Sequence, residues 1–444
     1  MIVRSAMPKQ PDPTTRARRR TPAWPVLTCF WVLALAGCGS PPAPPPTANP
    51  APATTPPVTP APAVPAPPPA PAPAPAPAPA EPTIPAVVSA ARGGETFTLL
   101  GTTIAPGTSQ RLTWSAAKIF EGMSSETPVL VVNGLEPGPV LCITAAVHGD
   151  ELNGMEMVRR VFQNLSPDTL RGAAIGIPIV NIQGFRRGSR YLPDRRDLNR
   201  FFPGNPQGSS AARIAHSLFE NIVRNCSALV DLHTGSFFRT NLPQVRADLG
   251  LQSVADLAHG FGGMLVLNSV AAPGTLRRAA TDAGIPAVIL EAGEPLRLQP
   301  KQVDQGVAGL KRLMRSLGMT RKATLLKQPE PVYYRSRWVR SDHGGVLFSV
   351  VRLGQTVRSG DILGTVTDPI TNEQNLVYSP AEGRVIGMAL NQVVMPGFAA
   401  FHIGTESQPG PNAALADPGS EESGKDRDVE ALDGAAETAA RDSE

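Results

Sequence analysis

The chain has 444 residues and a net charge of +4, with 41% hydrophobic, 18% charged and 5% aromatic residues. These values are ordinary for a soluble globular protein, and they exclude a collagen, a coiled coil and a multi-span membrane protein. The basic residues are scattered and have few aromatic residues between them, so the sequence gives little support to nucleic-acid binding.

The first forty residues predict an export signal that ends in a lipidation site. Several arginines within 16–20 precede the apolar stretch 26–37, which is too short to span a bilayer comfortably. The stretch closes with Leu-Ala-Gly-Cys38, which resembles a bacterial lipoprotein lipobox. The resemblance implies a signal peptide over 1–37 and a lipid anchor on Cys38, on the periplasmic face of the outer membrane. The alternative is a plain secretory signal with a chance cysteine.

Residues 38–90 predict a linker rather than a folded domain. Of the 49 prolines in the chain, 22 lie between positions 41 and 90, where they alternate largely with alanine. Such a segment cannot bury a core and favours an extended polyproline conformation of about 3.1 Å per residue. We interpret it as a tether; the alternative is a ligand for a polyproline-binding domain.

Residues 91–328 predict a layered α/β domain. Apolar runs indicate strands at 128–133, 141–147, 175–180, 228–232, 264–268 and 287–290. Helical periodicity indicates helices near 152–164, 208–225, 251–261, 276–283 and 301–317. Alternation of helices with continuously apolar strands is typical of a mainly parallel sheet covered by helices.

Polar residues follow four of these strands directly. They are His148, Asn181, His233 and Glu291. Because open α/β sheets build their sites at the carboxyl ends of strands, we expect these residues to meet in one crevice.

The first two histidine-bearing motifs, HGDELNG and DLHTG, predict a metal site. His148 and Glu151 are three positions apart at a helix start, and His233 could complete a set of three ligands with one position left open, as in catalytic zinc sites. The alternative for the first pair is a surface histidine beside an acid that caps the helix. Asp231 is either a partner of a ligand or part of a buried hydrogen-bond network.

Two other features leave less specific expectations. The loop 184–204 holds six arginines and two acids, which could form a cationic pocket wall. For Arg186, Arg187, Arg195 and Arg196 we favour a solvated basic loop. The four cysteines are too few and too scattered to predict a disulfide framework, and we expect Cys142 and Cys226 to be small buried hydrophobic residues.

Taken together, these motifs resemble the succinylglutamate desuccinylase/aspartoacylase family, which is related to the zinc carboxypeptidases. The matching segments lie at 148–154, 181–204, 231–235 and 285–294, within a resemblance that spans roughly 95–404. The resemblance implies a three-layer α/β domain with a mixed, mainly parallel sheet.

The resemblance also implies residue roles. His148, Glu151 and His233 would bind zinc, and Glu291 would be the catalytic general base. Arg190 would stabilise the oxyanion. Asn199 and Arg200 would hold a substrate carboxylate.

Residues 329–404 predict a small β-sandwich or barrel. The segments 354–364 and 379–385 resemble a biotinyl/lipoyl-type β-sandwich, which the family also appends. No lysine occurs between 328 and 424, which excludes a cofactor arm attached to lysine. We interpret this unit as a structural cap at the mouth of the active site. The tail 405–444, with eleven acidic and three basic residues, is predicted to be disordered.

The sequence therefore predicts a tethered zinc hydrolase of the cell envelope that cleaves an amide next to a carboxylate, as in an N-acyl amino acid. The alternatives are a metallocarboxypeptidase for peptides or peptidoglycan stem peptides, and a non-catalytic binding module that keeps the fold.

Overall fold

The computed structural model describes residues 92–120, 123–321 and 331–406. The chain divides into the units Met1–Pro79 and Ala80–Glu444, and all described residues belong to the second. The predicted signal peptide, Cys38, the linker, the boundary near 328 and the tail beyond 406 lie outside the described residues.

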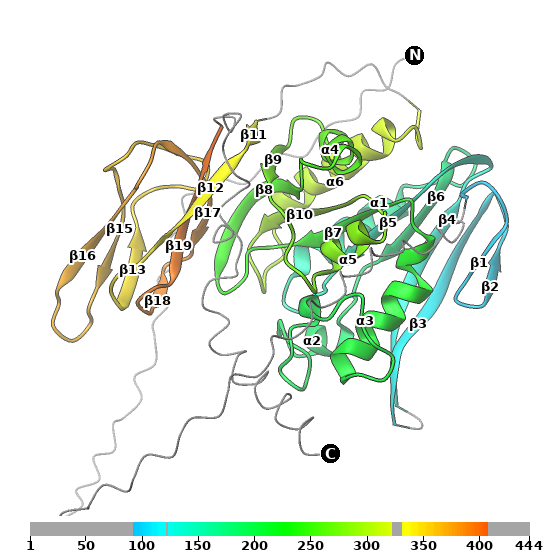
Figure 1. Ribbon diagram of the computed structural model, residues 1–444, viewed down its shortest axis with the longest axis horizontal. Coiled ribbons are helices and arrows are strands. Elements are labelled where there is room, and N and C mark those ends of the chain that lie inside the picture. Colours follow the sequence, from blue (N-terminus) through cyan, green and yellow to red (C-terminus); the bar gives the residue numbers. More distant parts are fainter. Residues whose placement is uncertain (1–91, 121–122, 322–330, 407–444) are drawn as a thin grey trace, which may run out of the picture. The chain divides into compact units, whose positions relative to one another are not determined.

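The second unit is built on a mixed, mainly parallel sheet (Figure 1). Its centre is formed by β5 (Glu136–Ala145), β6 (Arg171–Ile177), β7 (Ala228–His233) and β10 (Ala287–Gly293), which pair in parallel in the order β10-β7-β5-β6. Antiparallel strands flank this centre: β8 (Arg239–Ala247) pairs with β10, β4 (Met123–Asn133) pairs with β6, and β3 (Thr108–Phe120) pairs with β4. The short β9 (Leu265–Asn268) lies parallel to part of β8. A separate hairpin joins β1 (Phe97–Leu99) and β2 (Thr102–Ile104).

Helices cover both faces of this sheet and complete three layers. On one face, α1 (Leu152–Gln163), α4 (Gln252–His259) and α6 (Pro300–Ser316) contribute buried apolar residues to one core. On the other, α3 (Ser210–Asn221) and α5 (Leu276–Asp282) contribute to a second core. The strands serve both cores because successive side chains point to opposite faces. The predicted α/β fold class is confirmed.

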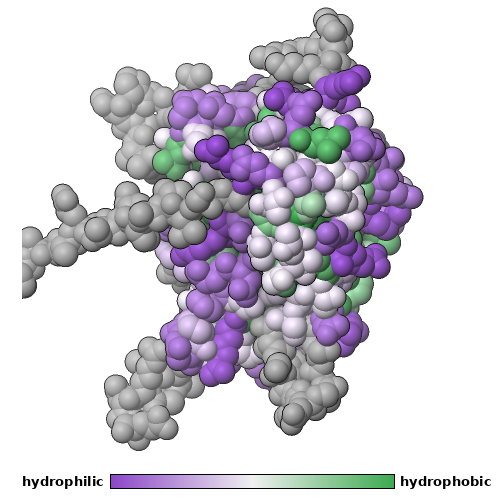
Figure 2. Space-filling view, turned by 90° about the vertical axis from the view of Figure 1, so that its right-hand side faces the viewer, coloured by the Kyte–Doolittle hydropathy of each residue, from purple (hydrophilic) through white to green (hydrophobic). Residues whose placement is uncertain are grey.

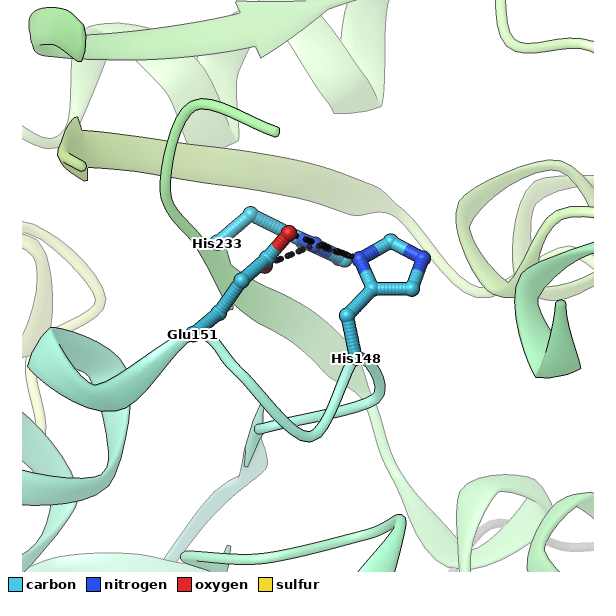
Figure 3. A group of neighbouring side chains, drawn as sticks. All are labelled: His148, Glu151 and His233. Atoms are coloured by element: carbon cyan, nitrogen blue, oxygen red, sulfur yellow. Dashed lines mark hydrogen bonds and ion pairs between the residues drawn. The ribbon is translucent and has the colours of Figure 1, made fainter. Parts of the chain in front are cut away.

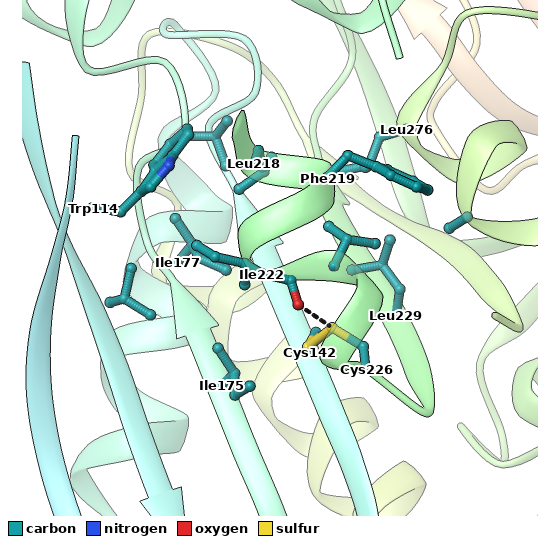
Figure 4. Close-up of a cluster of buried hydrophobic side chains, with 14 of the residues drawn as sticks. Trp114, Cys142, Ile175, Ile177, Leu218, Phe219, Ile222, Cys226, Leu229 and Leu276 are labelled. Atoms are coloured by element: carbon teal, nitrogen blue, oxygen red, sulfur yellow. Dashed lines mark hydrogen bonds between the residues drawn. A yellow bond between two sulfur atoms is a disulfide. The ribbon is translucent and has the colours of Figure 1, made fainter. Parts of the chain in front are cut away.

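A disulfide bond joins Cys142 and Cys226 within the second core (Figure 4). The expectation of two separate buried thiols was therefore wrong about their pairing, although both residues are buried. They are 84 positions apart in sequence, and no spacing pattern connects them. Cys142 lies in β5 and Cys226 lies two residues before β7, and the pairing of these neighbouring strands brings the two Cα atoms to 5.7 Å, within the range that a disulfide can bridge.

Residues 331–406, here called the C-terminal β-unit, add antiparallel strands, as predicted. One group, β12 (Arg335–Arg340), β19 (Ala399–Thr405) and β17 (Gly383–Ala389), continues the main sheet, because β17 pairs with β8. A four-stranded sheet lies beside it, with β16 (Gln374–Tyr378), β15 (Ile362–Thr367), β13 (Gly345–Ser349) and β18 (Gln392–Val394) in that order. The short strands β11 (Val332–Tyr333) and β14 (Thr356–Val357) pair with β9 and β17.

The helices and the surface of the described residues carry both hydrophobic and hydrophilic side chains. None of the helices in the described ranges is long and apolar enough to cross a bilayer. On the face turned to the viewer in Figure 2, hydrophobic residues are scattered among hydrophilic and neutral ones.

Candidate metal centre and active site

Three predicted residues meet at the carboxyl ends of β5 and β7 (Figure 3). The Nδ1 atom of His148 lies 2.8 Å from Oε1 of Glu151, and the Nδ1 atom of His233 lies 2.8 Å from Oε2 of the same carboxylate. The two Nδ1 atoms are 3.2 Å apart. One ligand atom from each residue falls within 4.8 Å of the others, and all three side chains are buried.

The local backbone explains how β5 delivers two of these residues. After the strand, Ala146 adopts a positive φ of 49°, which turns the chain sharply before His148. Glu151 is the N-cap residue of α1 by position, but its carboxylate is directed to the two histidines. The helix-cap interpretation of this acid is therefore wrong.

The donor set fits a zinc ion. Two imidazole nitrogens and one carboxylate are characteristic of catalytic zinc sites, in which three protein ligands leave one position open. Two ring nitrogens at 3.2 Å, buried beside a carboxylate, need a proton or a cation between them. The sequence predicted that these three residues lie together, and the structure places them so.

Each histidine also has an acid behind it. The Nε2 atom of His233 lies 2.7 Å from Asp231, whose other oxygen accepts a hydrogen bond from Thr144 at 2.7 Å. The Nε2 atom of His148 lies 3.2 Å from Asp197. A carboxylate on the far nitrogen orients a ligating imidazole and raises its basicity. Asp231 thus contacts a histidine of the cluster and also belongs to a buried hydrogen-bond network, so both expectations for it are met. Asp197 was not predicted to contact His148. The only sign of it in the sequence was an acid within an arginine-rich loop.

The electrostatics of the cluster favour positive charge between the acids. Burial by itself lowers the pKa of His148 and His233, but the neighbouring carboxylates outweigh it and raise the pKa of both. Burial by itself raises the pKa of Glu151 and Asp197, but the surrounding histidines, and Arg190 for Asp197, hold the pKa of both acids well below the usual range. Both acids are therefore ionised, which suits a cation site.

Arg190 lies at the edge of this cluster and is buried. Its Nε and Nη2 atoms donate to one oxygen of Asp197 at 3.2 and 2.9 Å. Its Nη1 atom is 3.2 Å from Nδ1 of His148 and 3.5 Å from Glu151. The guanidinium thus faces the place where the three donor atoms converge.

Glu291 is the direct register partner of His233 on the adjacent parallel strand. Paired residues point to the same face of a sheet on strands roughly 4.8 Å apart, so the predicted base lies beside His233. One carboxylate oxygen accepts a hydrogen bond from Nδ2 of Asn241 at 3.1 Å, and the other is 3.7 Å from Nη1 of Arg246.

The remaining predicted polar residues, Asn181, Asn199 and Arg200, differ in burial and in their contacts. Asn181 caps α2 (Ile182–Arg186), accepting from the N–H of Gly184, so its role is structural. Asn199 is buried in the short helix η1 (Leu198–Arg200), and its side-chain oxygen accepts from the N–H of Leu276 at 2.8 Å. Arg200 keeps its side chain 32% exposed, with Nη1 3.9 Å from Asp197. It is therefore the more accessible of the two expected carboxylate-binding residues.

The other arginines of the loop are at the surface, as expected. Arg186, Arg187 and Arg195 are exposed, and Arg196 is half-buried.

Comparison with known proteins shows what the domain is similar to. Residues 137–317 match the family model described as the succinylglutamate desuccinylase/aspartoacylase catalytic domain. The matched segment carries His148, Glu151 and His233, and it agrees with the family resemblance in the sequence.

Among curated proteins, the chain is similar to N-alpha-acetyl-L-2,4-diaminobutyric acid deacetylase of Halomonas elongata, with 28% identity over 54% of this chain and 74% of that protein. It is also similar to succinylglutamate desuccinylase of Pseudomonas aeruginosa, with 30% identity over 28% of this chain and 37% of that protein.

Solved structures share the fold of this desuccinylase/aspartoacylase-like domain. The succinylglutamate desuccinylase/aspartoacylase of Rhodobacter sphaeroides aligns with a TM-score of 0.62 and 23% identity, over 67% of this chain and 96% of that chain. An aspartoacylase family protein of Mesorhizobium loti aligns with a TM-score of 0.61 and 19% identity, over 72% of this chain and 100% of that chain.

Proposed function

We propose that this protein is a zinc-dependent deacylase that hydrolyses the amide bond of an N-acyl amino acid or a related carboxylate-bearing amide. The observation that carries the proposal is the convergence of Nδ1 of His148, the carboxylate of Glu151 and Nδ1 of His233 at the edge where Arg190 and Glu291 also lie. The two curated relatives, a deacetylase and a desuccinylase, support the same class of reaction.

His148, Glu151 and His233 are the proposed zinc ligands, with Asp197 and Asp231 orienting the two imidazoles. When bound, zinc supplies a nucleophile at neutral pH, because it lowers the pKa of a coordinated water to about 7.

The other side chains have separate roles in the proposed reaction. The carboxylate of Glu291 takes a proton from the attacking water and returns it to the departing amine. The guanidinium of Arg190 donates hydrogen bonds to the oxygen on which negative charge develops, and such preorganised donors strongly favour the transition state. The planar fork of Arg200 binds the substrate carboxylate, with the amide nitrogen of Asn199 as a further donor.

We also propose that the enzyme is anchored through lipid on Cys38 at the periplasmic face of the outer membrane. The lipobox-like residues before Cys38 support this location. The buried Cys142–Cys226 disulfide supports it independently, because disulfides persist in oxidising compartments and are rare in the cytosol.

The ligand assignment is tested by metal analysis. Purified protein should contain about one zinc ion per chain, and His148→Ala and His233→Ala should each lose it. His343→Ala, which changes an exposed histidine of the C-terminal β-unit, is the control and should keep the metal. Retention of zinc in both site variants would contradict the assignment.

The reaction is tested with a panel of N-acyl amino acids, peptides and muropeptides, with and without chelator. We expect release of a carboxylic acid from N-acyl amino acids and no release of amino acids from peptides. Glu291→Gln should bind zinc and hydrolyse nothing. Release of amino acids from peptides would instead favour the carboxypeptidase, and zinc-loaded protein that is inert on every substrate would favour a binding module.

A further inference from the structure

The loop that follows His233 holds an aromatic ring against the proposed oxyanion arginine. The ring centroid of Phe237 lies 5.4 Å from Cζ of Arg190 and 5.9 Å from Cζ of Arg239, so one ring serves two guanidinium groups. An aromatic face attracts a cation within about 6 Å of its centroid. Asp197 binds the same Arg190 guanidinium through two hydrogen bonds.

The backbone at this ring is in an uncommon conformation. Phe237 and Phe238 have positive φ values of 52° and 56°. Left-handed backbone is unfavourable for bulky side chains, and it persists only where surrounding structure enforces it. Such strained backbone is often found at functional sites, and here it places the ring of Phe237 next to Arg190.

The C-terminal β-unit supplies that enforcement. The carbonyl oxygen of Phe238 accepts hydrogen bonds from the N–H of Leu390 at 2.8 Å and from Nε2 of Gln392 at 3.0 Å. Directly after this loop, Arg239 pairs with Ala389 in the ladder between β8 and β17. The loop is therefore fixed on one side by His233 at the metal cluster and on the other by the C-terminal β-unit.

The side chain of Arg239 strengthens the same connection. It is buried, and its Nε atom donates to the carbonyl oxygen of Ala399 at 2.8 Å. Its Cζ atom lies 4.6 Å from the ring centroid of Phe398 and 5.1 Å from that of Trp338. Two aromatic rings of the C-terminal β-unit thus lie against the guanidinium group that also lies near Phe237.

We infer that Phe237 is a positioning residue for Arg190, and that the C-terminal β-unit holds Phe237 in place through Arg239. This inference rests on the proposed function, because it assumes that Arg190 stabilises the oxyanion in the reaction. An oxyanion donor is effective only when it is held at the point where charge develops, and small displacements are costly. The C-terminal β-unit therefore contributes to the chemistry through the position of Phe237.

The kinetic test compares two substitutions of the ring with a neighbouring control. Phe237→Leu keeps an apolar side chain but removes the aromatic face, and we expect kcat to fall about tenfold with little change in KM. Phe237→Tyr keeps the ring and should retain near wild-type kcat. Phe238→Leu changes an exposed residue with the same backbone conformation and should also retain activity. Wild-type kcat in Phe237→Leu, or an equal loss in the control, would overturn the inference.

A second measurement does not depend on turnover. Modification of Arg190 by a dicarbonyl reagent, followed by mass spectrometry, should be several times faster in Phe237→Leu and in Arg239→Met than in the wild type or Phe237→Tyr. Equal modification rates in all four proteins would overturn the inference. Failure of the wild type to hydrolyse any N-acyl amino acid would contradict only the proposed function, so the two failures can be told apart. Zinc content and thermal unfolding of each variant show whether the fold is intact.

Discussion

The disulfide between Cys142 and Cys226 should provide a large share of the stability of the described domain. It closes a loop of 84 positions. In the chain-entropy model, a loop of this length lowers the entropy of the unfolded chain enough to stabilise the fold by about 4–5 kcal/mol. Because typical domains unfold with only about 5–15 kcal/mol, the double variant Cys142→Ala/Cys226→Ala should be close to the limit of stability at 37 °C.

Denaturant unfolding followed by circular dichroism measures this loss. The double variant should lose about 4–5 kcal/mol of unfolding free energy, and at 25 °C it should keep its zinc if it is folded. Adding a reductant should move the unfolding midpoint of the wild type toward that of the variant and leave the variant unchanged. A double variant within about 1 kcal/mol of the wild type would refute the entropic reasoning.

Three further substitutions test the surroundings of the metal cluster. Asp197→Asn removes the carboxylate behind His148 and should weaken zinc binding about 10- to 100-fold in a competition with chelator, whereas unchanged affinity would show that this acid does not support the ligand. Gly149→Ala would drive a Cβ atom into the backbone at Gly184, so we expect lower zinc content and a lower Tm; normal values for both would mean that the loop can adjust. Asn153→Leu removes buried hydrogen bonds from α1 to β10 and to the start of α6. It should lower the free energy of unfolding, measured with denaturant, by about 2–3 kcal/mol, and a loss below about 0.5 kcal/mol would contradict this expectation.

The metal cluster could be predicted because its residues are tied to strands that the sequence marks clearly. Strands β5, β7 and β10 each contain a mainly apolar run, and a polar residue stands at or near the end of that run. Parallel strands in one sheet bring such residues to one edge, so the sequence alone predicts that His148, His233 and Glu291 lie together. The reliability of that inference depends on the order of the strands, which the sequence does not contain.

The missed features depend on contacts between distant segments. Strand β8 contains Pro243 and several polar residues, so its sequence lacks a strand pattern, and it is defined by pairing with β10. Pairing of the two cysteines required the adjacency of β5 and β7. The role of Asp197 comes from a loop that folds back onto His148, and loop conformation has no periodic signal in sequence.

The hydrogen bonding between β17 and β8 joins the C-terminal β-unit to the main sheet, so neither can be removed without exposing the other. β17 covers the first half of β8, β9 covers the second half, and β11 in turn covers β9. A protein shortened before residue 331 would present half of β8 and the outer side of β9 as bare edges, which are templates for aggregation. Residues 331–406 are therefore needed to cover these edges, and removing them should make the remaining domain prone to aggregate.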